Sequence, residues 1–354
     1  MVGGGFIARA HSNAFHQVGH FFDAPFSLRT KVVCGRNRTK LEAFAAQWEW
    51  EETASDWESV VTRPDIAIVD IAVPNALHAP IALAAARAGK IVFCEKPLAM
   101  NGKEAEQMAT AARKSGKINT VWFNYRRVPA IALAKQFIEQ GRIGEVFHYR
   151  AHYFNQSGLD PAKTNTWRYQ RAEAGSGAIG DLLSHSIDTA EYLNGEIREL
   201  SATTHTFAPG RDVDDAVQVL TRFSNGSIGS FEASRFGTGR RNGNGFEIYG
   251  SKGSLAFDLE EMNRLQFFDA SEPASLQAQR DLLVTGPDHP YSSIFWKPGH
   301  IIGYEHTFIA TLGDFLQALA KGEAFHPNFR DALRTQTVLS AVESAAASGV
   351  WRTI

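Results

Sequence analysis

The feature that most constrains the fold is an alternation, in the first third of the chain, between short apolar runs and longer helical segments. Repeated alternation of this kind predicts parallel βαβ units with right-handed crossovers. Runs dense in valine, isoleucine and phenylalanine are typical of strands that helices cover on both faces. The runs that fit are residues 31–34, 66–73, 91–95 and 118–123. The sequence therefore predicts a doubly wound parallel sheet of the Rossmann type.

The helices between these runs have readable ends. Ser55 with Glu58, and Asn101 with Glu104, have the spacing of a capping box, in which two side chains satisfy the first free amides of a helix. Gly89 and Gly116 stand where a glycine commonly ends a helix.

A second domain is expected from about residue 124. Residues 217–223 alternate apolar and polar side chains, and the following Asn225-Gly226 offers the positive φ angles of a tight hairpin. Residues 246–249 and 254–257 flank a glycine-containing turn and predict another hairpin, while 308–319 and 332–347 are helical by periodicity. We expect residues 1–123 to form the dinucleotide-binding domain. Residues 124–354 are expected to form an α+β domain for substrate binding and oligomerisation, with a large, open, mostly antiparallel sheet and a C-terminal helix packed back on the first domain.

Composition excludes several classes of function. The 36 basic and 38 acidic residues leave a net charge of −2, and basic residues do not cluster with aromatic ones, so a nucleic-acid partner is not expected. The two cysteines form no CxxC motif, and the sequence predicts neither disulfides nor a metal site. No run of about 18 apolar residues and no secretory leader is evident, so a membrane span is not expected and the cytoplasm is the default location.

A glycine-rich turn at the start of the chain fits the pattern G-x-G-x-x-G/A. In this pattern small residues permit a tight turn and let the main chain approach a pyrophosphate at a helix N-terminus. A flexible start of the chain is the alternative explanation. Because only two residues precede the turn, the strand expected before it is largely missing, and we expect the natural chain to extend upstream by about 5–6 residues or more. The residues concerned are Gly3, Gly5, Phe6, Ile7 and Ala8.

The residues after the next strand bear on the choice of cofactor. A carboxylate there binds the adenosine ribose of NAD, whereas basic side chains accommodate the 2′-phosphate of NADP. This chain has Arg36 and Arg38 at that place, which favours NADP or acceptance of both cofactors. The alternative is that both arginines are the solvated start of a helix.

Polar residues follow two more of the predicted strands. Pro74, Asn75 and His78 come after one strand, and Glu95 and Lys96 end the next. Ligands of open parallel sheets bind at these carboxyl ends. A lysine that ends a buried run is costly to desolvate without a partner or a function, although a strand-end lysine is more often simply solvated.

Asp181 and His185 are four residues apart, so on a helix they lie on one face. The histidine could then exchange a proton with a substrate hydroxyl that the carboxylate holds. A helix-start carboxylate and a structural histidine are the alternative.

In combination and in order, these motifs resemble those of the glucose-fructose oxidoreductase and inositol dehydrogenase (Gfo/Idh/MocA) family. The resemblance covers nearly the whole chain and includes Pro-Asn-x-x-His, Glu-Lys-Pro, the segment 123–127 and Gly-x-x-x-Asp-x-x-x-His. It implies a Rossmann domain with NAD or NADP, an open antiparallel sheet, and pairing of sheets into homodimers or homotetramers. It also implies that Lys96 polarises the substrate hydroxyl, Asp181 holds the sugar and His185 accepts the proton. The cofactor contacts it implies are those of the glycine turn with Arg36, Arg38, Pro74, Asn75, His78, Glu95, Lys96 and Asn124.

The expected reaction is hydride transfer between the nicotinamide and a secondary alcohol or ketone of a sugar, anhydrosugar, glycoside or inositol. The aromatic and polar residues available to bind a sugar ring are similar to those of relatives such as levoglucosan and glucoside 3-dehydrogenases. The expected substrate contacts are Arg126, Trp167, Arg168, His300 and His306. Packing in the core or between subunits is an equally open explanation of the late aromatic residues. Two other functions stay open, a redox-neutral NAD-dependent glycosidase and a non-catalytic NAD(P)-binding regulator.

Overall fold

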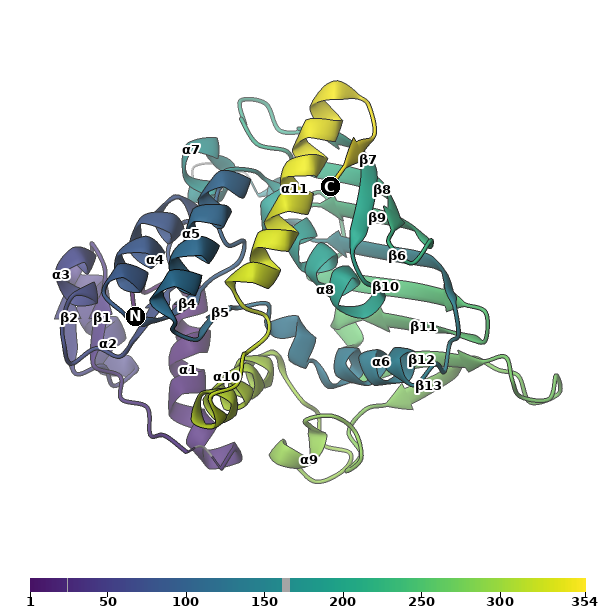
Figure 1. The fold of residues 1–354 in the computed structure, drawn as a ribbon, viewed down its shortest axis with the longest axis horizontal. Coiled ribbons are helices and arrows are strands. Elements are labelled where there is room, and N and C mark those ends of the chain that lie inside the picture. The colour runs from purple at the N-terminus through teal and green to yellow at the C-terminus, as the bar shows by residue number, and fades with distance from the viewer. Residues whose placement is uncertain (24, 161–165) are drawn as a thin grey trace. The chain divides into compact units, whose positions relative to one another are not determined.

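The computed structural model describes residues 1–23, 25–160 and 166–354 (Figure 1). The chain forms two compact units. The first consists of Met1–Asn124 and Tyr304–Gln336, and the second of Tyr125–Gly303 and Thr337–Ile354. Where one functional domain ends and the next begins stays a prediction.

The first unit contains the predicted parallel strands. Strands β3 (Ile68–Ile71), β4 (Ile91–Cys94) and β5 (Asn119–Val121) pair in that order, and β1 (Val32–Cys34) pairs with β2 (Glu52–Ala54), all in parallel. Between β1 and β3 the place of the expected missing strand is held by Val2, which forms parallel bridges to both Cys34 and Ile71. The predicted doubly wound sheet is confirmed.

Helices cover this sheet, and most begin and end for local reasons. Asn101 Oδ1 accepts from Glu104 N at the start of α5, and Gly116 ends α5 with a φ of 65°. The capping box expected at Ser55 is wrong by one residue, because Asp56 caps α3 by accepting from two amides. The helices of this unit are α1 (Phe6–Phe21), α2 (Arg38–Gln47), α3 (Trp57–Val61), α4 (His78–Arg87), α5 (Gly102–Ser115) and α10 (Tyr304–Lys321).

The second unit is built on a nine-stranded sheet in the order β13-β12-β11-β10-β6-β9-β8-β7-β14. Every pair in it is antiparallel except β6 with β9, so the predicted large and mostly antiparallel sheet is confirmed. Its strands are β6 (Val146–Phe154), β7 (Ile197–His205), β8 (Ala216–Phe223), β9 (Ile228–Ser234), β10 (Gly243–Gly250), β11 (Gly253–Asp258), β12 (Arg264–Asp269), β13 (Arg280–Leu283) and β14 (Arg352–Thr353).

The β8–β9 hairpin forms where Asn225-Gly226 predicts it, with one difference. Of the two residues only Gly226 has a positive φ, 90°, so the turn is not the symmetric two-residue type. Gly226 N donates to Phe223 O and Phe223 N to Ser227 O, which leaves three residues in the loop. Three-residue loops of this kind place one glycine in the left-handed region.

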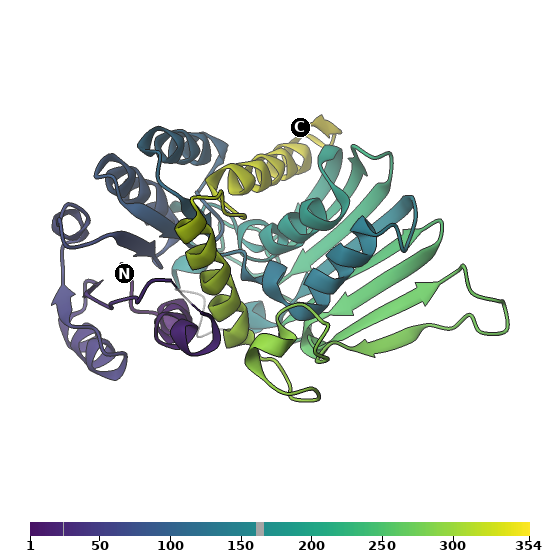
Figure 2. The same ribbon diagram turned by 60° about the horizontal axis from the view of Figure 1, so that its bottom comes forward.

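Helices α6 (Pro129–Glu139) and α8 (Ser184–Asn194) pack on one face of the nine-stranded sheet, and the opposite face is open among the described residues (Figure 2). Alternate residues of β8 are buried and exposed accordingly. The remaining α-helices are α7 (Arg171–Ala174) and α9 (Ser292–Phe295), which belong to the second unit, and α11 (Phe329–Ser348). The residues of α11 are divided between the two units. No helix among the described residues is long and apolar enough to cross a membrane.

Candidate active site

The glycine turn has the geometry that the dinucleotide pattern requires. Gly3 has a φ of +118°, and a Cβ there would lie 2.0 Å from the Ala72 carbonyl oxygen, so no other residue fits. Gly5, by contrast, has no heavy atom within 4 Å of a Cβ added to it, which leaves its main chain open to a ligand. Ala8 is fully buried in α1. Tight turn, open approach and close helix packing are the three functions of the small residues in this motif.

The N-terminus of α1 suits an anionic group. Its N-cap is Gly5, which has no side chain to accept from the first-turn amides, and residues 6–8 include no carboxylate. These amides and the positive end of the helix dipole attract negative charge. Phe6 is 71% exposed and stacks on Tyr304, with ring centroids 6.4 Å apart. The residues present therefore fit the pyrophosphate of a dinucleotide.

The two arginines after β1 are both exposed. Asn37 caps α2 by accepting from Lys40 N, and Arg38 is the first residue of the helix. Arg38 Nε donates to Glu42 Oε1 at 2.8 Å, an i,i+4 ion pair on the surface. Both explanations given for these arginines are compatible with this placement.

His78 connects the ends of two strands. It is the first residue of α4, its side chain is fully buried, and its Nδ1 and Nε2 lie 3.0 Å from the carbonyl oxygens of Pro97 and Val73, respectively. Burial lowers the pKa of this ring. Both nitrogens thus contact the main chain and connect the two segments, and the expected contact of His78 with the cofactor stays a prediction. Pro74 and the buried Asn75 lie at the start of the short helical turn before α4.

Lys96 lies directly after β4 and is half-buried. The Lys96–Pro97 bond is cis. The preceding Glu95 is buried, and its Oε2 accepts from Lys96 N at 3.0 Å. Asn124, another expected cofactor contact, donates from Nδ2 to Thr307 Oγ1 at 2.7 Å.

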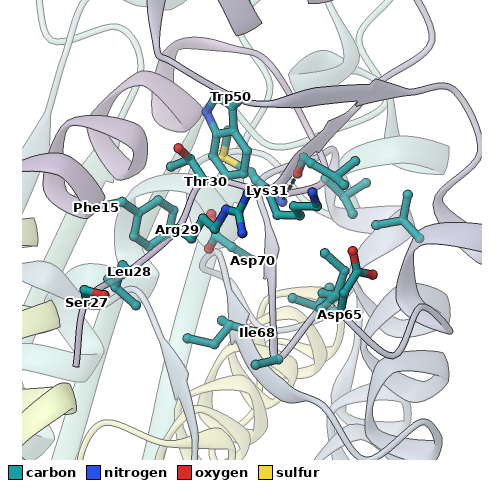
Figure 3. Close-up of a pocket in the computed structure, with 17 residues that line it drawn as sticks. Phe15, Ser27, Leu28, Arg29, Thr30, Lys31, Trp50, Asp65, Ile68 and Asp70 are labelled. Atoms are coloured by element: carbon teal, nitrogen blue, oxygen red, sulfur yellow. Dashed lines mark hydrogen bonds between the residues drawn. The ribbon is translucent and has the colours of Figure 1, made fainter.

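A separate cavity of about 330 Å³ lies at the opposite end of the first sheet (Figure 3). It is lined by residues before and within β1 and β3, among them Arg29, Lys31, Asp65 and Ile68. Met1 and Val2 also line it, and Val2 pairs with β1 and β3 at their carboxyl ends. Since ligands of parallel sheets bind at the carboxyl ends, we do not assign the cofactor to it.

Asp181 and His185 lie on one continuous helical segment in the second unit. Asp181 is in a π-helical turn, Ile179–Leu183, and His185 follows in α8. Asp214 caps the start of this segment by accepting from Gly177 N at 2.7 Å and Ile179 N at 2.8 Å. A Cβ at Gly177 would lie 1.7 Å from the Asp214 carbonyl oxygen, so this contact requires glycine. π-Helical turns are frequent at functional sites.

Asp181 is paired with a buried arginine that the sequence did not single out. Arg235 Nη2 lies 3.1 Å from Asp181 Oδ2, and the arginine side chain is 1% exposed against 27% for the aspartate. Arg235 also donates to the carbonyl oxygens of Arg168 and Gly177, and its guanidinium lies over the Tyr169 ring. One face of the Asp181 carboxylate is thereby fixed while part of it stays accessible.

The His185 ring packs against two tyrosines. Its centroid lies 4.5 Å from that of Tyr125 and 5.8 Å from that of Tyr153. The two tyrosine hydroxyl oxygens are 3.3 Å apart, and Tyr153 donates to Asn242 Oδ1 at 2.6 Å. Tyr125 stands within the family-like segment 123–127, which was the available signal for it.

The expected substrate residues lie in different surroundings. Arg126 is engaged in a two-bond ion pair with Asp188, which gives it a structural partner. Trp167 and Arg168 form a short helical turn whose main chain is tied to Arg235. His300 is exposed, with Nδ1 2.9 Å from Lys297 O.

His306 belongs to the first unit. It is buried at the start of α10, with its ring beside Phe21 of α1 and Nδ1 3.3 Å from Glu305 Oε1. Across the described residues, no group of three or more His, Cys, Asp and Glu side chains could hold a metal ion.

Comparison with known proteins agrees with this geometry. Residues 1–124 match the model of the oxidoreductase family with an NAD-binding Rossmann fold, and residues 131–256 match the GFO/IDH/MocA C-terminal domain. A levoglucosan dehydrogenase of Pseudarthrobacter phenanthrenivorans is 40% identical over an alignment of 376 positions, which covers 99% of this chain and 96% of that protein.

Solved structures give the same result. An oxidoreductase domain protein from Kribbella flavida is 44% identical with a TM-score of 0.96, and the match covers 100% of this chain and 97% of that one. A levoglucosan dehydrogenase in complex with NADH and levoglucosan is 41% identical with a TM-score of 0.97, covering 100% and 98%. These matches span both units, and they show that the chain belongs to the Gfo/Idh/MocA family of NAD-binding oxidoreductases.

Proposed function

We propose that the protein oxidises a secondary alcohol of a sugar or anhydrosugar with NAD or NADP, and that levoglucosan is the first substrate to test. The observation that carries the proposal is how three polar side chains are supported. The Lys96 main chain is bound by Glu95, Asp181 is paired with Arg235, and His185 packs against two tyrosines. The near full-length likeness to levoglucosan dehydrogenase supports the substrate class.

Each of the three residues has a distinct proposed role. His185 accepts the proton of the reacting hydroxyl, because a positioned imidazole is the usual general base. The Lys96 ammonium stabilises the negative charge that develops on the substrate oxygen. Asp181, fixed by Arg235, accepts hydrogen bonds from neighbouring sugar hydroxyls. The nicotinamide, when bound at the glycine turn, supplies the hydride acceptor.

The test is absorbance of NADH and NADPH with a panel of levoglucosan, other anhydrosugars, pyranosides and inositols. Oxidation of at least one panel member with net formation of reduced cofactor is expected. Hydrolysis of a glycoside without net reduced cofactor would indicate the redox-neutral glycosidase instead. Tight cofactor binding with no turnover of any member would indicate the regulator, and would reject the proposal.

We propose that Arg36 and Arg38 let the enzyme accept NADP. Residues 35–38 contain no carboxylate to repel a 2′-phosphate, and both arginines are exposed after β1. Changing both to alanine is expected to raise KM for NADP about tenfold, the effect of losing a charged hydrogen bond of about 1.5 kcal/mol, with KM for NAD within about twofold. Arg113→Ala, on the surface of α5, is the control. A wild-type KM for NADP far above that for NAD would reject this interpretation.

The open face of the nine-stranded sheet is our candidate for self-association into a homodimer or homotetramer. Leu220 is 56% exposed on β8 and Ile228 is 50% exposed on β9. Because Leu220 pairs with Ser230, two residues from Ile228, both apolar side chains point to this face. We propose that these two exposed apolar side chains lie in the contact between subunits.

Leu220→Glu is expected to convert the oligomer to a smaller species, because a charge would then face the apolar contact. Light scattering after size-exclusion chromatography measures the mass. Leu276→Glu, an exposed leucine outside the sheet, is the matched control. An unchanged mass for Leu220→Glu, or a monomeric wild type, would contradict the assignment.

We propose that the enzyme acts in the cytoplasm. Cys34 and Cys94 are both buried as free thiols, and free thiols are typical of a reducing compartment.

A further inference from the structure

A buried histidine in α1 contacts two carboxylates. His11 lies within the helix that the glycine turn begins, and its side chain is inaccessible to solvent. Its Nδ1 is 2.9 Å from Asp70 Oδ2, and its Nε2 is 3.0 Å from Glu95 Oε1. The ring also stacks on Trp122, with centroids 4.3 Å apart. The His11 imidazole thus connects α1 to β3 and to the residue that follows β4.

The contacts form a chain that ends at the main chain of Lys96. Asp70 Oδ1 accepts from Trp122 Nε1 at 2.9 Å, and Glu95 Oε2 accepts from Lys96 N at 3.0 Å. Each carboxylate therefore uses one oxygen for His11 and the other for a second donor. A fully bonded network of this kind fixes the orientation of every member.

The hydrogen-bonding chemistry of the Asp70 and Glu95 carboxylates indicates the charge state of the His11 ring. An ionised carboxylate can only accept, so both imidazole nitrogens donate only when the ring carries two protons. Burial lowers the pKa of His11, but the Asp70 and Glu95 carboxylates outweigh it and raise the pKa to about 9. Without the positive ring, two carboxylates would share a buried space with no charge between them, which is strongly unfavourable.

We propose that His11 is a positioning residue for Lys96, acting through the Glu95 carboxylate. Glu95 Oε2 accepts from the Lys96 amide, and Glu95 Oε1 contacts the His11 ring, so the ring fixes the carboxylate that positions the Lys96 main chain. Small displacements of a catalytic group lower the rate by large factors. The expected effect of His11 on turnover rests on the proposed function, in which Lys96 is catalytic. The expected effect of His11 on the position of the Lys96 main chain does not depend on that function.

The primary test is hydrogen exchange of the Lys96 amide, measured by NMR on the whole chain. In His11→Gln this amide is expected to exchange at least about tenfold faster than in wild type, with the β4 amides of Val92 and Cys94 within about twofold. His16→Gln, on the same helix with its ring on Trp48 O, is the matched control and should change neither. Unchanged exchange at Lys96, or equal acceleration throughout β4, would overturn the proposal. His11→Asn replaces His11→Gln if that variant does not fold, since it also removes the ring from Glu95 Oε1 and leaves the Glu95 carboxylate intact.

Two further measurements separate this inference from the proposed function. In His11→Gln we expect kcat with the best panel substrate to fall at least about tenfold while Kd for NADH stays within about threefold. If Lys96→Ala abolishes turnover and His11→Gln leaves kcat unchanged, positioning is wrong and the function stands. If Lys96→Ala retains turnover, the proposed role of Lys96 is wrong, and if the wild type turns over no panel member, the proposed function is wrong. In both cases the exchange experiment still decides the positioning.

The pH dependence supplies the last readout. The charged groups facing His11 are Asp70 from β3 and Glu95 after β4, and its other neighbours, Trp122 and Phe308, are uncharged rings. Since the folded pKa is above the ordinary value, the stability that the ring supplies is present below about pH 6.5 and is lost as pH rises through about 9. ¹⁵N-histidine NMR should show both His11 nitrogens protonated at pH 7, and a neutral ring there would contradict the network.

Discussion

Replacing Lys96 with alanine is expected to lower kcat/KM for the sugar by about 10³-fold, with the melting temperature nearly unchanged. Removing a preorganised charge from a developing oxyanion costs about 10² to 10³ in kcat, and loss of substrate orientation adds to it. Stability should change little because Lys96 is half-buried after the end of β4, outside the sheet pairing. Steady-state kinetics and thermal melting measure the two effects.

Two controls make this prediction specific. Lys96→Arg keeps the charge but not the geometry of a compact ammonium, so a partial loss is expected. Lys103→Ala removes an exposed lysine from α5 and should leave kcat/KM within about twofold. Retention of more than a tenth of wild-type kcat/KM by Lys96→Ala would contradict the proposed role.

The sequence predicts those parts of the fold that short stretches of neighbouring residues determine. The apolar runs became β1, β3, β4 and β5, and Asn101 and Gly116 define α5 as their chemistry requires. Strand β2 was missed because Glu52–Ala54 has no apolar run and is only partly buried. The cap of α3 was misplaced because Ser55 and Asp56 are both good caps and adjacent in sequence.

The candidate site was predicted only where its residues carry a pattern. Gly3, Gly5, Lys96, Asp181 and His185 stand in motifs, and the structure places Asp181 and His185 on a helical segment and the other three in the turns next to α1 and β4. Their supports, by contrast, come from distant sequence. Arg235 reaches Asp181 over 54 residues, and Glu95 reaches His11 over 84. Periodicity and spacing report local neighbours, so long-range pairs of this kind require a three-dimensional structure.

Replacing His185 with alanine is expected to lower kcat by about 10² to 10⁴, the usual contribution of a general base. The ring is 6% exposed and packed against Tyr125 and Tyr153, so its orientation is fixed by neighbours. Because a base must be unprotonated to accept the hydroxyl proton, wild-type kcat should rise with pH to a plateau. The variant should lose this rise, since solvent then takes the proton.

His185→Gln separates proton transfer from packing. Glutamine fills much of the space between Tyr125 and Tyr153 but cannot accept a proton at neutral pH. We therefore expect its kcat to be as low as that of the alanine variant, with a higher melting temperature because less of a cavity remains. His205→Gln, an exposed histidine on β7, is the matched control. If His185→Gln kept wild-type kcat and the same pH profile, another group would have to accept the proton, and His185 would be only a packing residue beside Tyr125.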